Sequence, residues 1–130
     1  MKADSACERY DMIVLGGGLT GLALADAVGG AGYRVLVIER APLPLLVSAP
    51  YDGRVTAVAL SARRFLESIG VWSSLVPDAG PIRDIVVREG FSPIQVHYDH
   101  REMGAEPLGY IIENRALRAA LLERAQALPT

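Results

Sequence analysis

Residues 11–39 decide the fold, and they read DMIVLGGGLTGLALADAVGGAGYRVLVIE. An apolar run at 11–15 is followed by a glycine cluster, a Leu- and Ala-rich stretch at 22–28 and a second apolar run at 34–38. Short apolar runs of this kind suit strands that are buried on both faces. The order strand, glycine turn, helix, strand within roughly thirty residues predicts a βαβ unit whose two strands are parallel neighbours.

The glycine cluster matches the dinucleotide-binding pattern G-x-G-x-x-G. In that pattern Gly16 permits the tight turn, Gly18 lets a pyrophosphate approach the backbone, and Gly21 lets helix and strand pack closely. Leu19 and Thr20 complete the loop, at the point where a helix N-terminus offers N–H groups and a positive dipole end to phosphates. We therefore predict a dinucleotide site over this loop.

Glu39 stands at the end of the second predicted strand. A carboxylate at this place accepts hydrogen bonds from the ribose of an adenosine, and it disfavours a 2′-phosphate, which would be a like charge. A tight structural turn without a ligand is the alternative, and the full strand, loop, helix and carboxylate context argues against it. The pattern does not distinguish NAD from FAD.

The middle of the chain predicts a long loop followed by a helix. Prolines and a glycine interrupt residues 40–57, so no regular element is expected there. Ser61 has the side chain of a helix N-cap, and Gly70 would end that helix. Apolar residues at helical spacing predict its buried face: Ala62, Phe65, Leu66 and Ile69.

The last third predicts strands and a final helix. Residues 82–88, 94–99 and 108–112 read as three short strands without helices between them, which suggests an antiparallel sheet beside the βαβ unit. Alternation over 94–99 predicts a half-exposed strand. Asn114 is expected to cap the final helix. Two parallel strands are fewer than a doubly wound sheet needs, so the fold class is α/β with an incomplete nucleotide-binding fold.

Composition excludes several functions. The 130 residues carry a net charge of −2, which gives no reason to expect nucleic-acid binding. One cysteine, Cys7, excludes a disulfide framework within the chain. His97 and His100 have a metal-like spacing but no companion ligand, so we expect surface histidines and no metal site. Without a signal-peptide or membrane-spanning stretch, we expect a cytoplasmic protein.

The chain resembles the UbiH/UbiF family of FAD-dependent aromatic-ring hydroxylases, relatives of p-hydroxybenzoate hydroxylase. The resemblance covers nearly the whole chain, and its most specific parts are the segment 52–54, Asp-Gly-Arg, and the segment 109–114. The matching stretches are DMIVLGGGLTGLALA (11–25), VLVIER (35–40), DGRVTAVALSARRFLESIGVW (52–72), PIRDIVV (81–87) and LGYIIENRALRAAL (108–121).

This resemblance implies that FAD is the cofactor and that NAD(P)H is the reductant. It implies cofactor contacts at Arg40, directly after Glu39, and at Arg54, which would lie along the FAD. Asn114 or Arg115, at the start of the last helix, would approach the pyrophosphate or ribose. Members of the family continue well beyond this length, and their second FAD motif, a Gly-Asp pair, is absent here. We therefore expect a loose leader at 1–10 and the N-terminal part of an FAD-binding domain at 11–130.

The resemblance further implies an aromatic, polyprenylated phenol of ubiquinone biosynthesis as substrate of the parent enzyme. Such a hydrophobic substrate suggests that the parent enzyme makes peripheral contact with the inner membrane. No catalytic base is identifiable in this chain, and we expect the chain alone not to hydroxylate. Two strands with an open edge also suggest self-association.

Two alternatives remain from the residues themselves. A flavin amine oxidase or desaturase shares the opening GGGxTGL, but residues 40–53 lack the glycine-rich R-x-G-G segment of those enzymes. A non-catalytic module that binds nucleotide or serves assembly is the second alternative. A flavin absorbance spectrum of the purified chain separates these possibilities.

Overall fold

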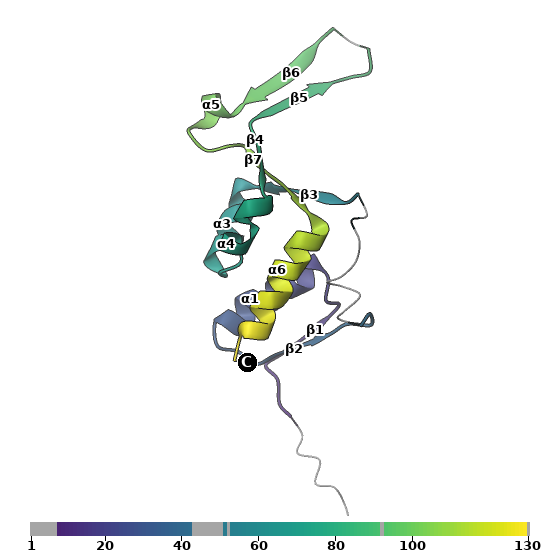
Figure 1. Cartoon of the computed structure of the whole chain (residues 1–130), viewed down its shortest axis with the longest axis vertical. Helices are drawn as coiled ribbons and strands as arrows, with labels where there is room; N and C mark the ends of the chain where they lie inside the picture. Colours follow the sequence, from purple (N-terminus) through teal and green to yellow (C-terminus); the bar gives the residue numbers. More distant parts are fainter. Residues whose placement is uncertain (1–7, 43–50, 52, 92, 130) are drawn as a thin grey trace, which may run out of the picture.

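The computed structural model describes residues 8–42, 51, 53–91 and 93–129. Its elements follow one another along the long axis of the molecule (Figure 1). A βαβ unit lies at one end, a three-stranded sheet with its helices occupies the middle, and a β-hairpin projects at the other end. Most of the predicted leader lies outside the described residues.

The βαβ unit consists of β1 (Met12–Leu15), α1 (Leu19–Gly30) and β2 (Val35–Ile38). The two strands are parallel and in register from the pair Met12↔Val35 to the pair Leu15↔Ile38. This arrangement confirms the prediction made from residues 11–39. The helix is longer than the apolar stretch 22–28 suggested, because the loop residues Leu19 and Thr20 already belong to its first turn.

The central sheet contains β3 (Val55–Ala59), β7 (Gly109–Glu113) and β4 (Gly80–Ile82) in that order, with all neighbours antiparallel. The expectation of a loop through residue 57 was wrong at its end, because β3 begins at Val55. Its pairing partner β7 lies more than fifty positions later in the chain, so local pattern gave no sign of it.

The helices α3 (Leu60–Ser68), α4 (Trp72–Leu75) and α6 (Asn114–Ala127), with the 3-10 turn η1 (Val76–Asp78), pack against this sheet and α1. The core they form with α1, β3 and β7 is apolar. Its members are Leu22, Val58, Leu66, Ile69, Val71, Trp72, Leu75, Ile112, Leu117, Ala120, Leu121 and Leu122.

Three details of the helix predictions were wrong. The residue that caps α3 is Ala59, not Ser61, because β3 runs directly into the helix. Ala62 and Phe65 were expected on the buried face of this helix, but both are exposed, whereas Leu66 and Ile69 are buried as predicted. The N-cap residue of α6 is Glu113, whose side chain makes no capping hydrogen bond; Asn114 is the first helical residue, and its side chain accepts a hydrogen bond from Thr56.

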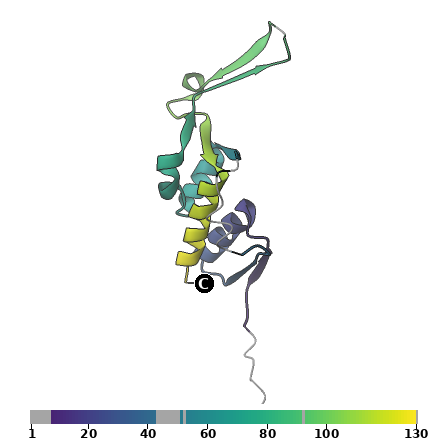
Figure 2. The same ribbon diagram turned by 45° about the vertical axis from the view of Figure 1, so that its right-hand side comes forward.

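The projecting hairpin consists of β5 (Asp84–Arg88) and β6 (Gln95–Asp99), followed by the short helix α5 (His100–Met103). The antiparallel sheet that we expected is therefore divided into two, because the chain leaves the central sheet at Arg83. Figure 2 shows the hairpin standing clear of the helices. Both strands are exposed, although one was expected to be half-buried. One face is apolar and is formed by Ile85, Val87, Val96 and Tyr98.

One charged side chain is buried among the described residues. Asp26 of α1 is 1% exposed, and neither of its carboxylate oxygens has a hydrogen-bond partner. Burial raises its pKa to about 6, and the positive charge of Arg124 on α6 lowers it in part. The Nε of Arg124 itself donates to the carbonyl of Ile69, at 2.9 Å.

Candidate cofactor site

Two glycines fix the path of the loop between β1 and α1. Gly16 has φ +105°, a conformation that side-chain-bearing residues rarely adopt, and its N–H donates to the carbonyl of Ile38 at 2.8 Å. At Gly21, a Cβ would lie 2.0 Å from the carbonyl oxygen of Gly16 and 3.3 Å from Cγ1 of Val14. The tight turn and the close helix–strand packing expected from the sequence are therefore present.

Gly18 is the N-cap of α1 and faces open space. It is exposed, and a Cβ at this position would meet no atom within 4 Å. No side chain caps the helix, and its first turn contains no acidic residue. The N–H groups and positive dipole end of α1 are thus accessible to an anion, such as a pyrophosphate, that approaches over Gly18.

Glu39 binds the loop directly. One carboxylate oxygen accepts the N–H of Gly17 at 2.7 Å, and the other accepts the N–H of Ala41 at 2.8 Å. The hydrogen bond from Ala41, and then that from Gly17, lower the pKa of this carboxyl. Each oxygen of a carboxylate can accept more than one hydrogen bond, so both oxygens remain able to accept from a ribose. The sequence pattern did not reveal the role of Gly17.

The second group of predicted residues meets where β3 begins and β7 ends. The carbonyl of Arg54 accepts the N–H of Asn114 at 3.1 Å. The hydroxyl of Thr56 donates to Oδ1 of Asn114 at 2.6 Å. The structure thus brings Arg54 and Asn114 together, and their contacts with a cofactor stay a prediction. Thr56 was not predicted, although it lies in the same DGRVT stretch.

The three predicted arginines all lie at the surface. The Nε of Arg115 donates to the carboxylate of Glu113, and its guanidinium lies 5.5 Å from the ring centroid of Tyr51. These two contacts fix the cation beside the first turn of α6. Arg40 and Arg54 are exposed, and Asp52 of the Asp-Gly-Arg segment is outside the described residues.

The glycine loop and the start of α6 lie toward the same end of a helix pair. Helices α1 and α6 pack side by side (Figure 1). Near their C-terminal ends, a Cβ on Gly30 would come within 3.8 Å of the guanidinium of Arg124. The helices therefore run in the same direction, and their N-terminal ends point to the same side of the molecule.

The histidines do not share a site. Nε2 of His97 lies 2.9 Å from Oδ1 of Asp84 across the hairpin, whereas His100 begins α5. Within the described ranges, no three side chains of His, Cys, Asp or Glu gather as a metal centre would require. In the same residues, no helix combines the length and the apolar composition needed to cross a bilayer.

Solved structures define the class of this fold. The C294A mutant of 2-methyl-3-hydroxypyridine-5-carboxylic acid oxygenase matches with a TM-score of 0.69 and 21% identity, over 95% of this chain and 30% of that one. The p-nitrophenol 4-monooxygenase PnpA from Pseudomonas putida DLL-E4 matches with a TM-score of 0.66 and 22% identity, over 91% of this chain and 28% of that one. The fold is that of part of a flavin-dependent aromatic monooxygenase.

Proteins related in sequence indicate a narrower group within this class of monooxygenases. The ubiquinone hydroxylase UbiL of Rhodospirillum rubrum is 43% identical over 125 residues, which are 96% of this chain and 29% of the relative. The ubiquinone hydroxylase UbiM of Neisseria meningitidis is 36% identical over 118 residues, 87% of this chain and 26% of the relative. No family model matches the sequence.

A third relative, the 3-demethoxyubiquinol 3-hydroxylase of Escherichia coli K12, is 31% identical over 121 residues. The resemblance to ubiquinone-biosynthesis hydroxylases is therefore confirmed. The chain spans less than a third of the length of these relatives, 31% in the Escherichia coli enzyme.

Proposed function

We propose that this chain forms the part of a flavin-dependent aromatic hydroxylase that binds the adenosine diphosphate half of FAD. The observation that carries the proposal is the loop geometry: Glu39 holds the loop through Gly17, while Gly18 and the start of α1 stay open. The pyrophosphate would lie over Gly18, and the adenosine ribose would hydrogen-bond to Glu39. Arg54, Asn114 and Arg115 would lie along the cofactor.

When bound, FAD supplies the oxygen and electron-transfer chemistry of such an enzyme. The chain itself positions the cofactor. The ionised Glu39 fixes the loop and the ribose, and the α1 dipole stabilises the phosphate charge. The engaged guanidinium of Arg115 adds positive charge beside the first turn of α6.

For the whole enzyme we propose a polyprenylated phenol of ubiquinone biosynthesis as the substrate, and NAD(P)H as the reductant. The names of the relatives support this substrate class. A cytoplasmic enzyme in peripheral contact with the inner membrane would meet such a substrate. The relatives favour a hydroxylase over a flavin amine oxidase or desaturase.

Titration of the 130-residue chain with FAD, ADP and FMN tests the proposal. FAD and ADP share the adenosine diphosphate half that the loop is expected to hold, whereas FMN lacks the adenosine. We expect FAD and ADP to bind and FMN not to bind, measured by calorimetry. Equal binding of FMN, or no binding of ADP, would contradict the assignment. If the whole protein bound ADP as tightly as FAD, the flavin half would add nothing to the affinity, and the non-catalytic nucleotide-binding alternative would be favoured.

Gly18→Val is expected to weaken ADP and FAD binding by about a hundred-fold or more, because the branched side chain occupies the space that the pyrophosphate needs. Since the site is open and φ is −76°, the change should lower the free energy of unfolding by only about 1 kcal/mol, as a poorer N-cap does. Calorimetry with ADP and urea unfolding measure the two effects. Retention of ADP by a folded Gly18→Val chain would place the pyrophosphate elsewhere.

Glu39→Ala is expected to weaken ADP binding by roughly ten- to a hundred-fold, the range for a charge-assisted hydrogen bond. The ADP affinity of Glu39→Gln should lie between those of the wild type and Glu39→Ala, because the one amide oxygen can replace only part of the carboxylate. Glu89→Ala removes an exposed carboxylate outside the loop and serves as the control. An unchanged dissociation constant in Glu39→Ala would refute the ribose role.

A further inference from the structure

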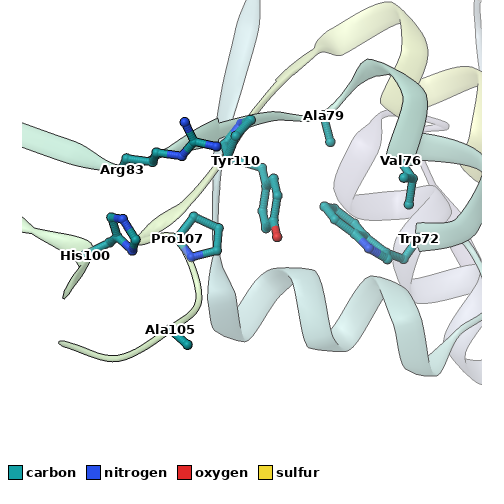
Figure 3. A pocket seen from close by; sticks show the side chains of 9 residues that line it. Trp72, Val76, Ala79, Arg83, His100, Ala105, Pro107 and Tyr110 are labelled. Atoms are coloured by element: carbon teal, nitrogen blue, oxygen red, sulfur yellow. The ribbon is translucent and has the colours of Figure 1, made fainter.

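Away from the glycine loop, a cavity lies between α4 and the base of the hairpin. It has a volume of about 450 Å³, which is within the range of small-molecule pockets. Figure 3 shows the side chains that line it. The chain elements that form it are α4, η1, β4, β7 and the residues around α5. The residues proposed to bind FAD do not line it.

One part of this cavity is aromatic and apolar. The rings of Trp72 and Tyr110 meet edge to face, with centroids 4.9 Å apart, and Pro81 pairs with Tyr110 across β4 and β7. Pro107 lies beside the Tyr110 ring in Figure 3. Flat walls of this kind suit a planar ring, because aromatic and proline faces give a large contact area at fixed geometry.

The other part is polar and is formed by Arg83 and His100. The N–H of His100 donates to the carbonyl of Arg83 at 2.9 Å, which holds these two residues together at the base of the hairpin. Nδ1 of His100 is buried and has no hydrogen-bond partner. Among the described residues no carboxylate pairs with Arg83. The nearby carboxylate of Asp99 is bound by Arg101.

The lining residues therefore include a cation and an imidazole but no carboxylate. We propose that this cavity binds an aromatic carboxylate, with its ring against Tyr110 and Pro107 and its carboxylate toward Arg83 and His100. A guanidinium donates charge-assisted hydrogen bonds to a carboxylate, and the ring contacts confer the preference for an aromatic acid over an aliphatic one. The inference does not depend on the proposed FAD site.

Fluorescence of the chain tests this inference, because Trp72 is its one tryptophan. Benzoate is the probe, benzamide is the neutral ring of the same shape, and acetate is the carboxylate without a ring. We expect benzoate to change the Trp72 emission saturably, and benzamide and acetate to bind at least ten-fold more weakly. Saturating ADP should leave the benzoate affinity unchanged. Competition by ADP would move benzoate to the loop site and overturn the inference.

Arg83→Gln should weaken benzoate binding by about ten-fold or more, since it replaces the charged guanidinium with a shorter, neutral polar group. Arg88→Gln is the matched control, because Arg88 is an exposed arginine of the same hairpin that does not line the cavity. His100→Ala is a second variant, which removes the imidazole from the lining. The inference is refuted if benzoate causes no saturable change, or if Arg83→Gln and Arg88→Gln bind it equally well.

Discussion

Gly21→Ala is expected to lower the free energy of unfolding by on the order of 3 kcal/mol, as forced overpacking against backbone does. The added Cβ would come 2.0 Å from the carbonyl oxygen of Gly16, and a backbone carbonyl cannot rotate away as a side chain can. The first turn of α1 must then move off β1. Leu22, the next residue, is part of the core, so the displacement spreads into it.

Urea unfolding followed by circular dichroism measures the loss at Gly21. Gly18→Ser provides the control, because it adds a side chain to the same loop at an open position where serine is a favoured N-cap. We expect that control to unfold at the wild-type urea concentration or above it. If Gly21→Ala were as stable as Gly18→Ser, the close contact between helix and strand would not exist in solution.

Asp26→Ala is expected to stabilise the chain at pH 8 by about 2 kcal/mol, with an upper bound of roughly 3 kcal/mol from the pKa shift of the carboxyl. The pKa is raised from 3.8 to about 6 in the fold, mainly because burial disfavours the charged form. The ionised carboxylate therefore destabilises the folded state. Alanine removes this charge and is a better helix former than aspartate.

The sign of the pH dependence follows from the raised pKa of Asp26. Near pH 4 the carboxyl is protonated in the folded state and only about half ionised in the unfolded state, so most of the penalty is absent. It grows as the pH rises from 4 to 6 and is complete above 6. The gain from Asp26→Ala should therefore be large at pH 8 and small at pH 4, as measured by urea midpoints. A gain that is equal at both pH values would contradict the destabilising charge.

The sequence predicted the βαβ unit because all its signals are local. The apolar runs, the glycines and Glu39 lie within one continuous stretch, and each has a physical meaning without knowledge of the rest of the chain. The contact between Glu39 and Gly17 was not predicted, since G-x-G-x-x-G leaves the second position free. This contact depends on the path of the loop in three dimensions, which the sequence pattern does not specify.

Features that depend on contacts between distant parts of the chain could not be predicted from local sequence patterns. Strand β3 is short and pairs with β7 far along the chain, so the segment was interpreted as a loop. The helical spacing of Phe65 indicated a buried face, but its side chain is exposed in the structure. Asp26 interrupts a helix of Leu and Ala without any pattern to mark it as buried. Its environment depends on α6, nearly a hundred residues later.

The hairpin of β5 and β6 has a consequence for the cooperativity of unfolding. Within the described part of the chain its two strands pair only with each other, and its apolar face is exposed. An isolated two-stranded hairpin is marginally stable in water. The hairpin can therefore open as a separate unit, well below the free energy at which the sheet of β3, β7 and β4 melts. Amide protons of the hairpin are thus released by local opening, whereas those of the central sheet require global unfolding.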